Sequence, residues 1–284
     1  MDDNEKSIID LAKGIGPGNE SDGDVPKRPG LQQVSETVAP QSSQDLQNAL
    51  DDLLSKSRMK QAWISIDLPS KDLENMPPLN IRLRPFRYED ERKLRSATSV
   101  TESTQVLDDI INSCMQGASL RDVTLADKNY ILYKLRQLSY GDEYEVGMAC
   151  EGCATQNQLV VKMSSLKTNR ATPEMQNPFP ITLPDSEIRV MVREMMAKDE
   201  AVFNNPEDLT ENLWKVVESV GEYNDRMIIQ NFLKQCTARD ISYLRNNIFT
   251  DRMGIDTNVK FRCNTCSKEQ TMTLPINEGF FSAS

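Results

Sequence analysis

The residues of this sequence with the clearest chemical signature are four cysteines in two Cys-x-x-Cys pairs, Cys150/Cys153 and Cys263/Cys266. A structural zinc ion needs four ligands in a tetrahedron, and two such pairs of thiolates can supply all of them. The pairs are separated by far more than the ~15–20 residues of a compact zinc ribbon. A shared site therefore requires a fold that brings two distant segments together.

An internal repeat explains the distance between the two pairs. Residues 124–153 match residues 237–266 at a constant offset of 113, without a gap and with seven identical residues. Thr124 and Thr237 each stand three positions before an aspartate, which is the spacing of a helix capping box. The matched segments therefore predict one capped helix in each copy.

The repeat also predicts the elements that position the cysteines. We expect each capped helix to stop at a glycine, Gly141 in one copy and Gly254 in the other, because glycine favours the left-handed C-cap. A strand, a Cys-x-x-Cys turn and a returning strand then form a zinc-knuckle hairpin in each copy. Upstream, Ile110-Ile111-x-x-Cys114 matches Phe232-Leu233-x-x-Cys236, and we expect both of these cysteines to fill the core.

These elements predict an α+β protein. It would contain two pseudo-repeated modules, each with a β-strand, helices and a zinc-knuckle β-hairpin. The modules are expected over residues 61–165 and 185–284, joined by a linker over 166–184 that contains four prolines.

The modules would be preceded by a disordered N-terminal tail. Residues 1–60 hold 11 acidic and 7 basic residues and no aromatic one, and such a composition does not bury enough apolar surface to fold. Leucines at helical spacing nevertheless predict a helix over 43–60, capped by Ser43. This segment is either a docking helix for a partner or a nascent helix of a disordered tail.

One shared metal site follows if the two modules pack about a pseudo-twofold axis, because their hairpins would then meet. We expect one structural Zn²⁺ per chain, held by Cys150, Cys153, Cys263 and Cys266. Four thiolates fill the tetrahedron and leave no place for a catalytic water. Two alternatives stay open, a pair of redox disulfides and hairpins that pack without metal. A thioredoxin-like redox pair is expected at the start of a helix rather than between strands.

The composition excludes most familiar catalytic chemistry. The 284 residues include no histidine, which removes the Ser-His-Asp and Cys-His nucleophile systems and every metal site that needs imidazole. No carboxylate pair stands in an obvious acid–base context, and no glycine-rich phosphate loop is present. We therefore expect no catalytic residues and no enzymatic activity.

The charge balance favours a protein partner. With 33 basic and 43 acidic residues the net charge is −10, which opposes attraction to nucleic acid and to anionic lipid. No run of about 18 apolar residues predicts a membrane span. Met1–Glu5 is acidic where a signal peptide is basic, so we expect a reducing cytoplasm. The main alternative is a zinc-ribbon nucleic-acid-binding regulatory protein, although the one dense basic cluster, over 82–95, is more typical of a solvated face.

Several short motifs resemble those of the T4-type bacteriophage baseplate hub assembly proteins. They are Leu68-Pro69-Ser70-Lys71, then Ile81-Arg82-Leu83-Arg84-Pro85-Phe86 with Tyr88-Glu89-Asp90-Glu91, then Leu135-Arg136-x-Leu138-Ser139-Tyr140-Gly141 with Cys150-Glu151-Gly152-Cys153, and last Leu274-Pro275-Ile276-Asn277-Glu278-Gly279-Phe280-Phe281. The resemblance covers about Ile64 to Phe281. The sequence departs from the family's usual opening at Asp72, where the family often has glycine.

The resemblance implies a non-enzymatic phage tail morphogenesis protein, either a baseplate hub component or a hub assembly factor of the assembly-catalyst type. The implied partners are other phage baseplate hub proteins, with the tape-measure protein as a further candidate. The protein would act in the host cytoplasm during assembly or remain in the virion baseplate. A zinc core would hold two related surfaces at a fixed angle while the tail helix captures a partner.

Overall fold

The computed structural model describes residues 42–56, 63–96, 100–203, 210–275 and 278–281. The chain divides into two units, Met1–Arg58 and Met59–Ser284. The disorder expected for residues 1–41 and the last residues of the helix expected over 43–60 lie outside the described ranges. Within those ranges no helix combines the length and the apolar composition that a membrane crossing needs.

Helix α1 (Ser43–Lys56) is the element described in the first unit. The Ser42 Oγ accepts a hydrogen bond from the Asp45 N–H at 3.1 Å and donates one to the Asp45 Oδ2 at 2.7 Å. The expected cap at Ser43 was therefore wrong by one position, because Ser42 is the serine that stands three residues before the aspartate.

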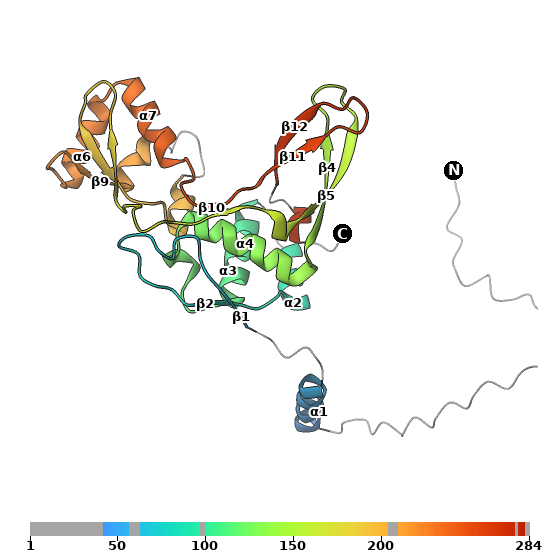
Figure 1. The fold of residues 1–284 in the computed structure, drawn as a ribbon. Coiled ribbons are helices and arrows are strands. Elements are labelled where there is room, and N and C mark those ends of the chain that lie inside the picture. Colours follow the sequence, from blue (N-terminus) through green and yellow to red (C-terminus); the bar gives the residue numbers. More distant parts are fainter. Residues whose placement is uncertain (1–41, 57–62, 97–99, 204–209, 276–277, 282–284) are drawn as a thin grey trace, which may run out of the picture. The chain divides into compact units, whose positions relative to one another are not determined.

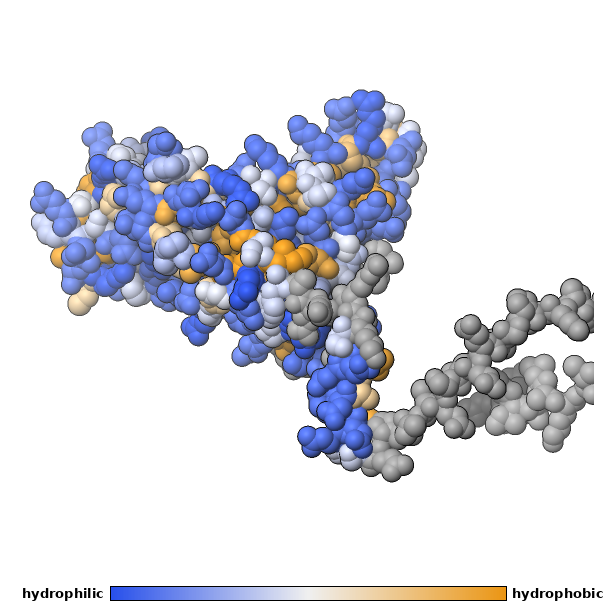
Figure 2. Space-filling model, turned by 60° about the horizontal axis from the view of Figure 1, so that its bottom comes forward, coloured by the Kyte–Doolittle hydropathy of each residue, from blue (hydrophilic) through white to orange (hydrophobic). Residues whose placement is uncertain are grey.

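One face of α1 carries an exposed leucine stripe. Leu46, Leu50 and Leu53 are 57%, 48% and 66% exposed. Their spacing of four and then three residues places them on one side of the helix. In Figure 2 hydrophobic atoms lie along one edge of this otherwise hydrophilic helix.

The second unit begins with a three-stranded antiparallel sheet. Its strands lie in the order β1 (Ile64–Ile66), β2 (Ile81–Leu83) and β3 (Met115–Gln116). The β2 side chains alternate, with Ile81 and Leu83 buried and Arg82 exposed, as in a strand with one face on the core. The helices in the same half of this unit are α2 (Tyr88–Arg95), α3 (Val100–Ser113), η2 (Leu120–Asp122) and α4 (Leu125–Tyr140).

A second antiparallel sheet follows. Its strands lie in the order β7 (Phe179–Thr182), β8 (Arg189–Val192) and β9 (Val217–Val220). The helices in this half of the unit are η4 (Ala197–Val202), η5 (Leu213–Lys215), α6 (Arg226–Gln235) and α7 (Ala238–Ile248). The segment 166–184 therefore contains β7, and it also contains β6 (Thr168–Asn169), which pairs with β10 (Gly254–Ile255).

Two β-hairpins carry the cysteine pairs. They consist of β4 (Glu143–Ala149) with β5 (Gln156–Lys162), and of β11 (Asn258–Arg262) with β12 (Glu269–Thr273). In Figure 1 the two hairpins lie side by side and extend away from α4, with α6 and α7 at the opposite end of this unit. The mixed α+β class and the two strand, turn, strand segments expected from the sequence are confirmed.

The second unit has two main apolar cores. One surrounds the first sheet, α3, α4 and the bases of the hairpins, and the other lies between the second sheet, α6 and α7. The C-terminal segment η6 (Glu278–Phe281) closes the first core. The Phe280 ring meets Tyr133 and Tyr144 edge to face, at centroid distances of 5.0 and 5.3 Å.

The helices α4 and α7 begin where the repeat predicts. The Thr124 Oγ1 accepts from the Asp127 N–H at 3.0 Å, and the Thr237 Oγ1 accepts from the Asp240 N–H at 3.1 Å. Helix α4 also ends as expected, at Gly141 with φ +92°.

Helix α7 ends earlier than expected. Its C-cap is Phe249, so the predicted stop at Gly254 was wrong. Gly254 has φ +115° and lies in β10, where an added Cβ would come within 3.3 Å of the Ala126 Cβ. This glycine is therefore required by the close approach of β10 to α4 rather than by a helix end.

A buried or half-buried ion pair follows the middle strand of each sheet. The Arg84 Nη1 lies 2.7 Å from the Asp90 Oδ2, and the Arg193 Nη1 lies 2.6 Å from the Asp199 Oδ2. Each aspartate also accepts from the backbone N–H three residues before it, at 2.9 and 2.8 Å. The two aspartates thus cap α2 and η4 in the same way.

Cys114 and Cys236 both follow the end of a helix, as the match predicts, and each donates its N–H to the carbonyl four residues before it. Their places beside the sheets differ. The Arg84 N–H donates to the Cys114 carbonyl at 3.0 Å, and the Arg193 N–H donates to the Val216 carbonyl at 3.0 Å. Val216 thus stands where Cys114 does, while Cys236 caps the end of α6. Burial raises the pKa of both thiols to about 11, so both stay protonated at neutral pH, as expected of packing residues.

Candidate metal centre

The structure brings the four paired cysteines into one cluster at the tips of the two hairpins. All four Sγ atoms lie within 4.8 Å of one another. Two close sulfur pairs cross between the hairpins: the Sγ atoms of Cys150 and Cys266 are 3.6 Å apart, and those of Cys153 and Cys263 are 3.7 Å apart. The cluster therefore exists only because two segments distant in sequence meet.

These sulfur distances fit a tetrahedral metal and do not fit disulfides. Four ligands at ~2.3 Å from a tetrahedral ion are about 3.8 Å from one another. A disulfide needs sulfurs about 2.05 Å apart. At 3.6 and 3.7 Å, the cross-hairpin pairs are close to the first value and far from the second.

The two cysteine turns have the same local structure. The Cys150 Sγ accepts from the Gly152 N–H at 3.2 Å, and the Cys263 Sγ accepts from the Thr265 N–H at 3.4 Å. The residue after each second cysteine has a left-handed backbone, with φ +58° at Ala154 and +59° at Ser267. Backbone N–H groups that point at sulfur favour the thiolate, which is the form that binds metal.

The acidity of the thiols reflects this arrangement. Backbone N–H groups of Cys266 and Thr265 lower the pKa of Cys263 to about 6. Burial opposes ionisation of Cys150, but the N–H groups of its turn outweigh it and lower that pKa also. Although the Lys268 N–H favours its thiolate, neighbouring thiols raise the pKa of Cys266 to about 11. A cation among the sulfurs removes the repulsion that opposes further ionisation.

Two buried amides, Asn157 and Gln270, connect the turns. The Gln270 Oε1 accepts from the Glu151 N–H at 2.8 Å, and its Nε2 donates to the Cys150 Sγ at 3.1 Å. The Asn157 Oδ1 accepts from the Asn264 N–H at 3.0 Å, and its Nδ2 lies 3.7 Å from the Cys263 Sγ. Each amide comes from one hairpin and holds the cysteine turn of the other.

Neither amide is among the metal-site residues predicted from the sequence, although their spacing carries a signal. Asn157 and Gln270 are separated by 113 residues, the same offset that relates the cysteines, so the match continues four residues past the last cysteine of each pair. Both positions hold an amide rather than the same residue, and a comparison by identity alone passes over them.

The cluster has a protected side and an open side. Cys150 and Cys263 are buried, whereas Cys153 and Cys266 are exposed. Four thiolates complete a tetrahedron, so an ion bound here has no free position for water or substrate. The donor set therefore suits a structural ion that links two hairpins and not a catalytic one.

Two of the basic residues near the site are engaged in ion pairs. Lys268 lies 3.5 Å from Glu151 of the other hairpin, and Arg262 lies 2.7 Å from Glu269. In the basic segment 82–95, Arg84 is buried against Asp90. These pairs reduce the positive potential that a nucleic-acid surface would need.

Comparison with protein-family models matches residues 59–282 to the family described as T4 bacteriophage base plate protein. The match covers most of the 284-residue chain and includes both cysteine pairs. Searches of curated proteins and of solved structures each found no match.

Proposed function

Because this chain belongs to the T4 bacteriophage base plate protein family, we propose that it acts as a non-enzymatic baseplate hub component or hub assembly factor. Membership in the family supports a structural role in the phage tail baseplate, in contact with other baseplate proteins. The finer assignment to the hub rests on the motifs between Leu68 and Phe281 that resemble hub assembly proteins.

The proposal includes one structural Zn²⁺ per chain, held by Cys150, Cys153, Cys263 and Cys266. The observation that carries it is the sulfur cluster, with cross-hairpin distances of 3.6 and 3.7 Å. Structural zinc contributes about 10–16 kcal/mol of binding free energy in small domains, which is comparable to the whole net stability of a protein. The ion would therefore clamp the two hairpins together.

The proposal also treats the two halves of the second unit as copies, with modules over 61–165 and 185–284 joined by 166–184. It is supported by contacts that occur twice, among them the two threonine caps, the two Arg–Asp pairs and the two cysteine turns. The reciprocal amides are a further pair. A duplicated module accounts for one metal site built from two distant pairs of cysteines.

Helix α1 is the element proposed to capture a partner. Its leucine stripe, Leu46, Leu50 and Leu53, is exposed, and an amphipathic helix can bind by laying such a face into an apolar groove. The proposed partners are hub proteins, with the tape-measure protein as a further candidate. Capture takes place in the host cytoplasm, and the protein then leaves or stays in the virion.

Co-purification with the hub proteins of the same phage tests this function. The full chain retains them, whereas Leu50→Asp lowers the retained amount at least tenfold, because a charge enters the apolar stripe. Asn48→Asp is the matched control, since it adds the same charge at another exposed position of α1 and leaves the stripe intact. Failure of the unaltered chain to retain any hub protein would contradict the hub assignment.

A further inference from the structure

An isolated β-bridge joins the half of the second unit that contains the sheet β1–β3 to the half that contains the sheet β7–β9. The Leu125 N–H donates to the Met195 carbonyl at 2.8 Å, and the Ala197 N–H donates to the Val123 carbonyl at 2.9 Å. Thr124 and Met196 face each other at its centre. We call residues 123–125 the cap tripeptide and residues 195–197 the docking tripeptide of this joint.

The cap tripeptide has a counterpart at residues 236–238. Thr124 and Thr237 are the N-caps of α4 and α7, and their backbone angles agree closely, with φ −68°, ψ 160° and φ −64°, ψ 157°. The chain therefore presents the same local backbone at Cys236–Ala238 as at the edge that the docking tripeptide occupies.

The docking tripeptide also has a counterpart, at residues 86–88. Arg87 and Met196 both precede a capping aspartate by three residues, and each donates its N–H to that carboxylate, at 2.9 and 2.8 Å. Their backbone is extended in both cases, with φ −104°, ψ 165° and φ −90°, ψ 155°. Phe86–Tyr88 therefore has the shape of a second docking tripeptide.

Both counterparts are unused within the described part of the chain. There the Phe86 carbonyl and the Tyr88 N–H, which match the groups that Met195 and Ala197 use, have no backbone hydrogen-bond partner. The Cys236 carbonyl and the Ala238 N–H, which match those of Val123 and Leu125, have no backbone partner either. The free donor and acceptor on one tripeptide thus complement those on the other.

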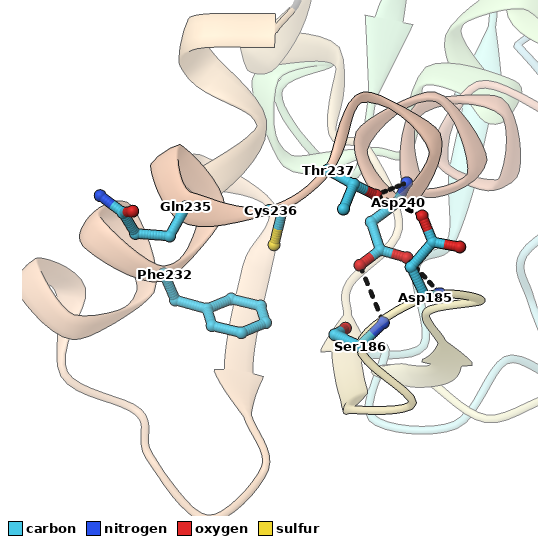
Figure 3. Close-up of a pocket in the computed structure, with 7 residues that line it drawn as sticks. All are labelled: Asp185, Ser186, Phe232, Gln235, Cys236, Thr237 and Asp240. Carbon is cyan, nitrogen blue, oxygen red and sulfur yellow. Dashed lines mark hydrogen bonds between the residues drawn. The ribbon is translucent and has the colours of Figure 1, made fainter.

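The surfaces beside the two unused tripeptides are suited to contact. A cavity of about 160 Å³ lies next to Cys236 and is lined also by Phe232 and Ser186; Figure 3 shows the Cys236 sulfur between these two residues. The exposed Ala238 stands where the internal joint has the larger Leu125. Tyr88, at 77% exposed, is an aromatic of the type enriched at interfaces.

We propose that Phe86–Tyr88 of one chain pairs with Cys236–Ala238 of a second copy, in the manner of the internal joint. The pseudo-twofold packing expected from the sequence would form both joints within one chain if it extended to the whole of each half. In the described residues only one joint is formed, so the reciprocal relation is limited to the two hairpins. The contact is therefore head to tail, and such contacts add further copies until a ring closes. The proposal is independent of the zinc site, because none of these residues belongs to the cysteine cluster.

Two proline substitutions remove one N–H each from the proposed joint. Ala238 and Tyr88 are the first residues of α7 and α2, a position at which proline is well tolerated in helices. The residues before them are extended, as proline requires of its predecessor. Ala238→Pro removes the N–H that the cap side would donate to the Phe86 carbonyl. Tyr88→Pro removes the N–H that the docking side would donate to the Cys236 carbonyl. Ala238→Gly keeps the N–H and is the matched control.

Sedimentation velocity on the full chain measures the result. The unaltered chain and Ala238→Gly are expected to rise above the monomer mass of 32.2 kDa as concentration increases, while each proline variant stays at 32.2 kDa. A mixture of the two proline variants then forms a dimer of twice that mass, because each supplies the side that the other lacks. Tyr88→Ala changes only an exposed side chain and is expected to raise the dissociation constant about tenfold.

The proposal is overturned if the unaltered chain remains a monomer at all concentrations, or if the mixed proline variants remain monomers while the unaltered chain associates. Association of either proline variant alone, as strong as that of the unaltered chain, also contradicts it. The zinc content of every variant is expected to equal that of the unaltered chain, so a failure of this joint is distinguishable from a failure of the metal site.

Discussion

The Gln270 side chain of one hairpin donates a hydrogen bond to the Cys150 sulfur of the other hairpin at 3.1 Å. Asn157 makes the reciprocal connection to the turn of Cys263. The two hairpins are thus held in register by protein groups as well as by any ion between them. Hydrogen bonds of this kind orient metal ligands and commonly affect metal affinity.

Replacing Gln270 by leucine is predicted to weaken metal binding. The substitution removes the donor to Cys150 and leaves the Glu151 N–H without its acceptor. Loss of such a supporting residue lowers metal affinity by about 10–100-fold, which competition with a coloured zinc chelator measures. Thr271→Val on the exposed face of the same strand is the control and should leave the affinity unchanged. Equal affinities for Gln270→Leu and the control would contradict a role for the amide.

The Arg84–Asp90 pair is predicted to contribute pH-dependent stability. Burial of Asp90 alone would raise its pKa, but the hydrogen bonds from Arg84 and from the Arg87 N–H hold the pKa below its usual range. A carboxyl whose pKa is lower in the folded state stabilises the fold above about pH 4, and this stability is lost as the pH falls through the folded-state pKa. Asp90→Asn is therefore expected to lower the free energy of unfolding by about 3 kcal/mol at pH 7.

Urea unfolding at several pH values checks this prediction. The difference between Asp90→Asn and the unaltered chain should shrink below about pH 4, where the carboxyl becomes protonated. Asp67→Asn removes the aspartate of an exposed pair with Lys71, whose side chains are 65% and 54% exposed, and should leave the urea midpoint unchanged. A constant difference across the pH range would show that the charge of Asp90 is not responsible.

Phe280 is predicted to be essential for the first core. It is fully buried and packs edge to face on Tyr133 and Tyr144, so Phe280→Ala should cost about 3–5 kcal/mol in the free energy of unfolding. Phe249, which is 37% exposed, also makes one edge-to-face contact, with Phe203. Phe249→Ala should cost clearly less, and equal losses in denaturant unfolding would contradict the role of the C-terminal segment in this core.

The elements that the sequence predicts well are those whose signal is local. The threonine caps of α4 and α7 and the strand, turn, strand pattern around the cysteines depend on residues within a few positions, and the structure has them where expected. The cap of α1 was placed one residue too late, at Ser43, because adjacent serines satisfy the same pattern and only the bond to Asp45 distinguishes them.

The features that could not be predicted from the sequence depend on contacts between distant segments. Gly254 looks like a helix end, but its backbone is set by the approach of β10 to Ala126. Cys236 matches Cys114 in sequence spacing, but hydrogen bonding to the neighbouring strand shows that Val216 takes that place. The amides Asn157 and Gln270 gain their role only when the hairpins meet. Their spacing of 113 residues marks them as a matched pair, but the contacts that they make depend on the fold.

The zinc content of the purified full chain tests the central claim most directly. Elemental analysis is predicted to find one zinc per chain, and Cys150→Ser and Cys263→Ser, which each remove a buried ligand, are predicted to lower it to near zero. Two zinc ions per chain would mean that each hairpin binds its own metal. A chain that contains no zinc after purification under reducing conditions, and takes up none when zinc is added, would contradict the account.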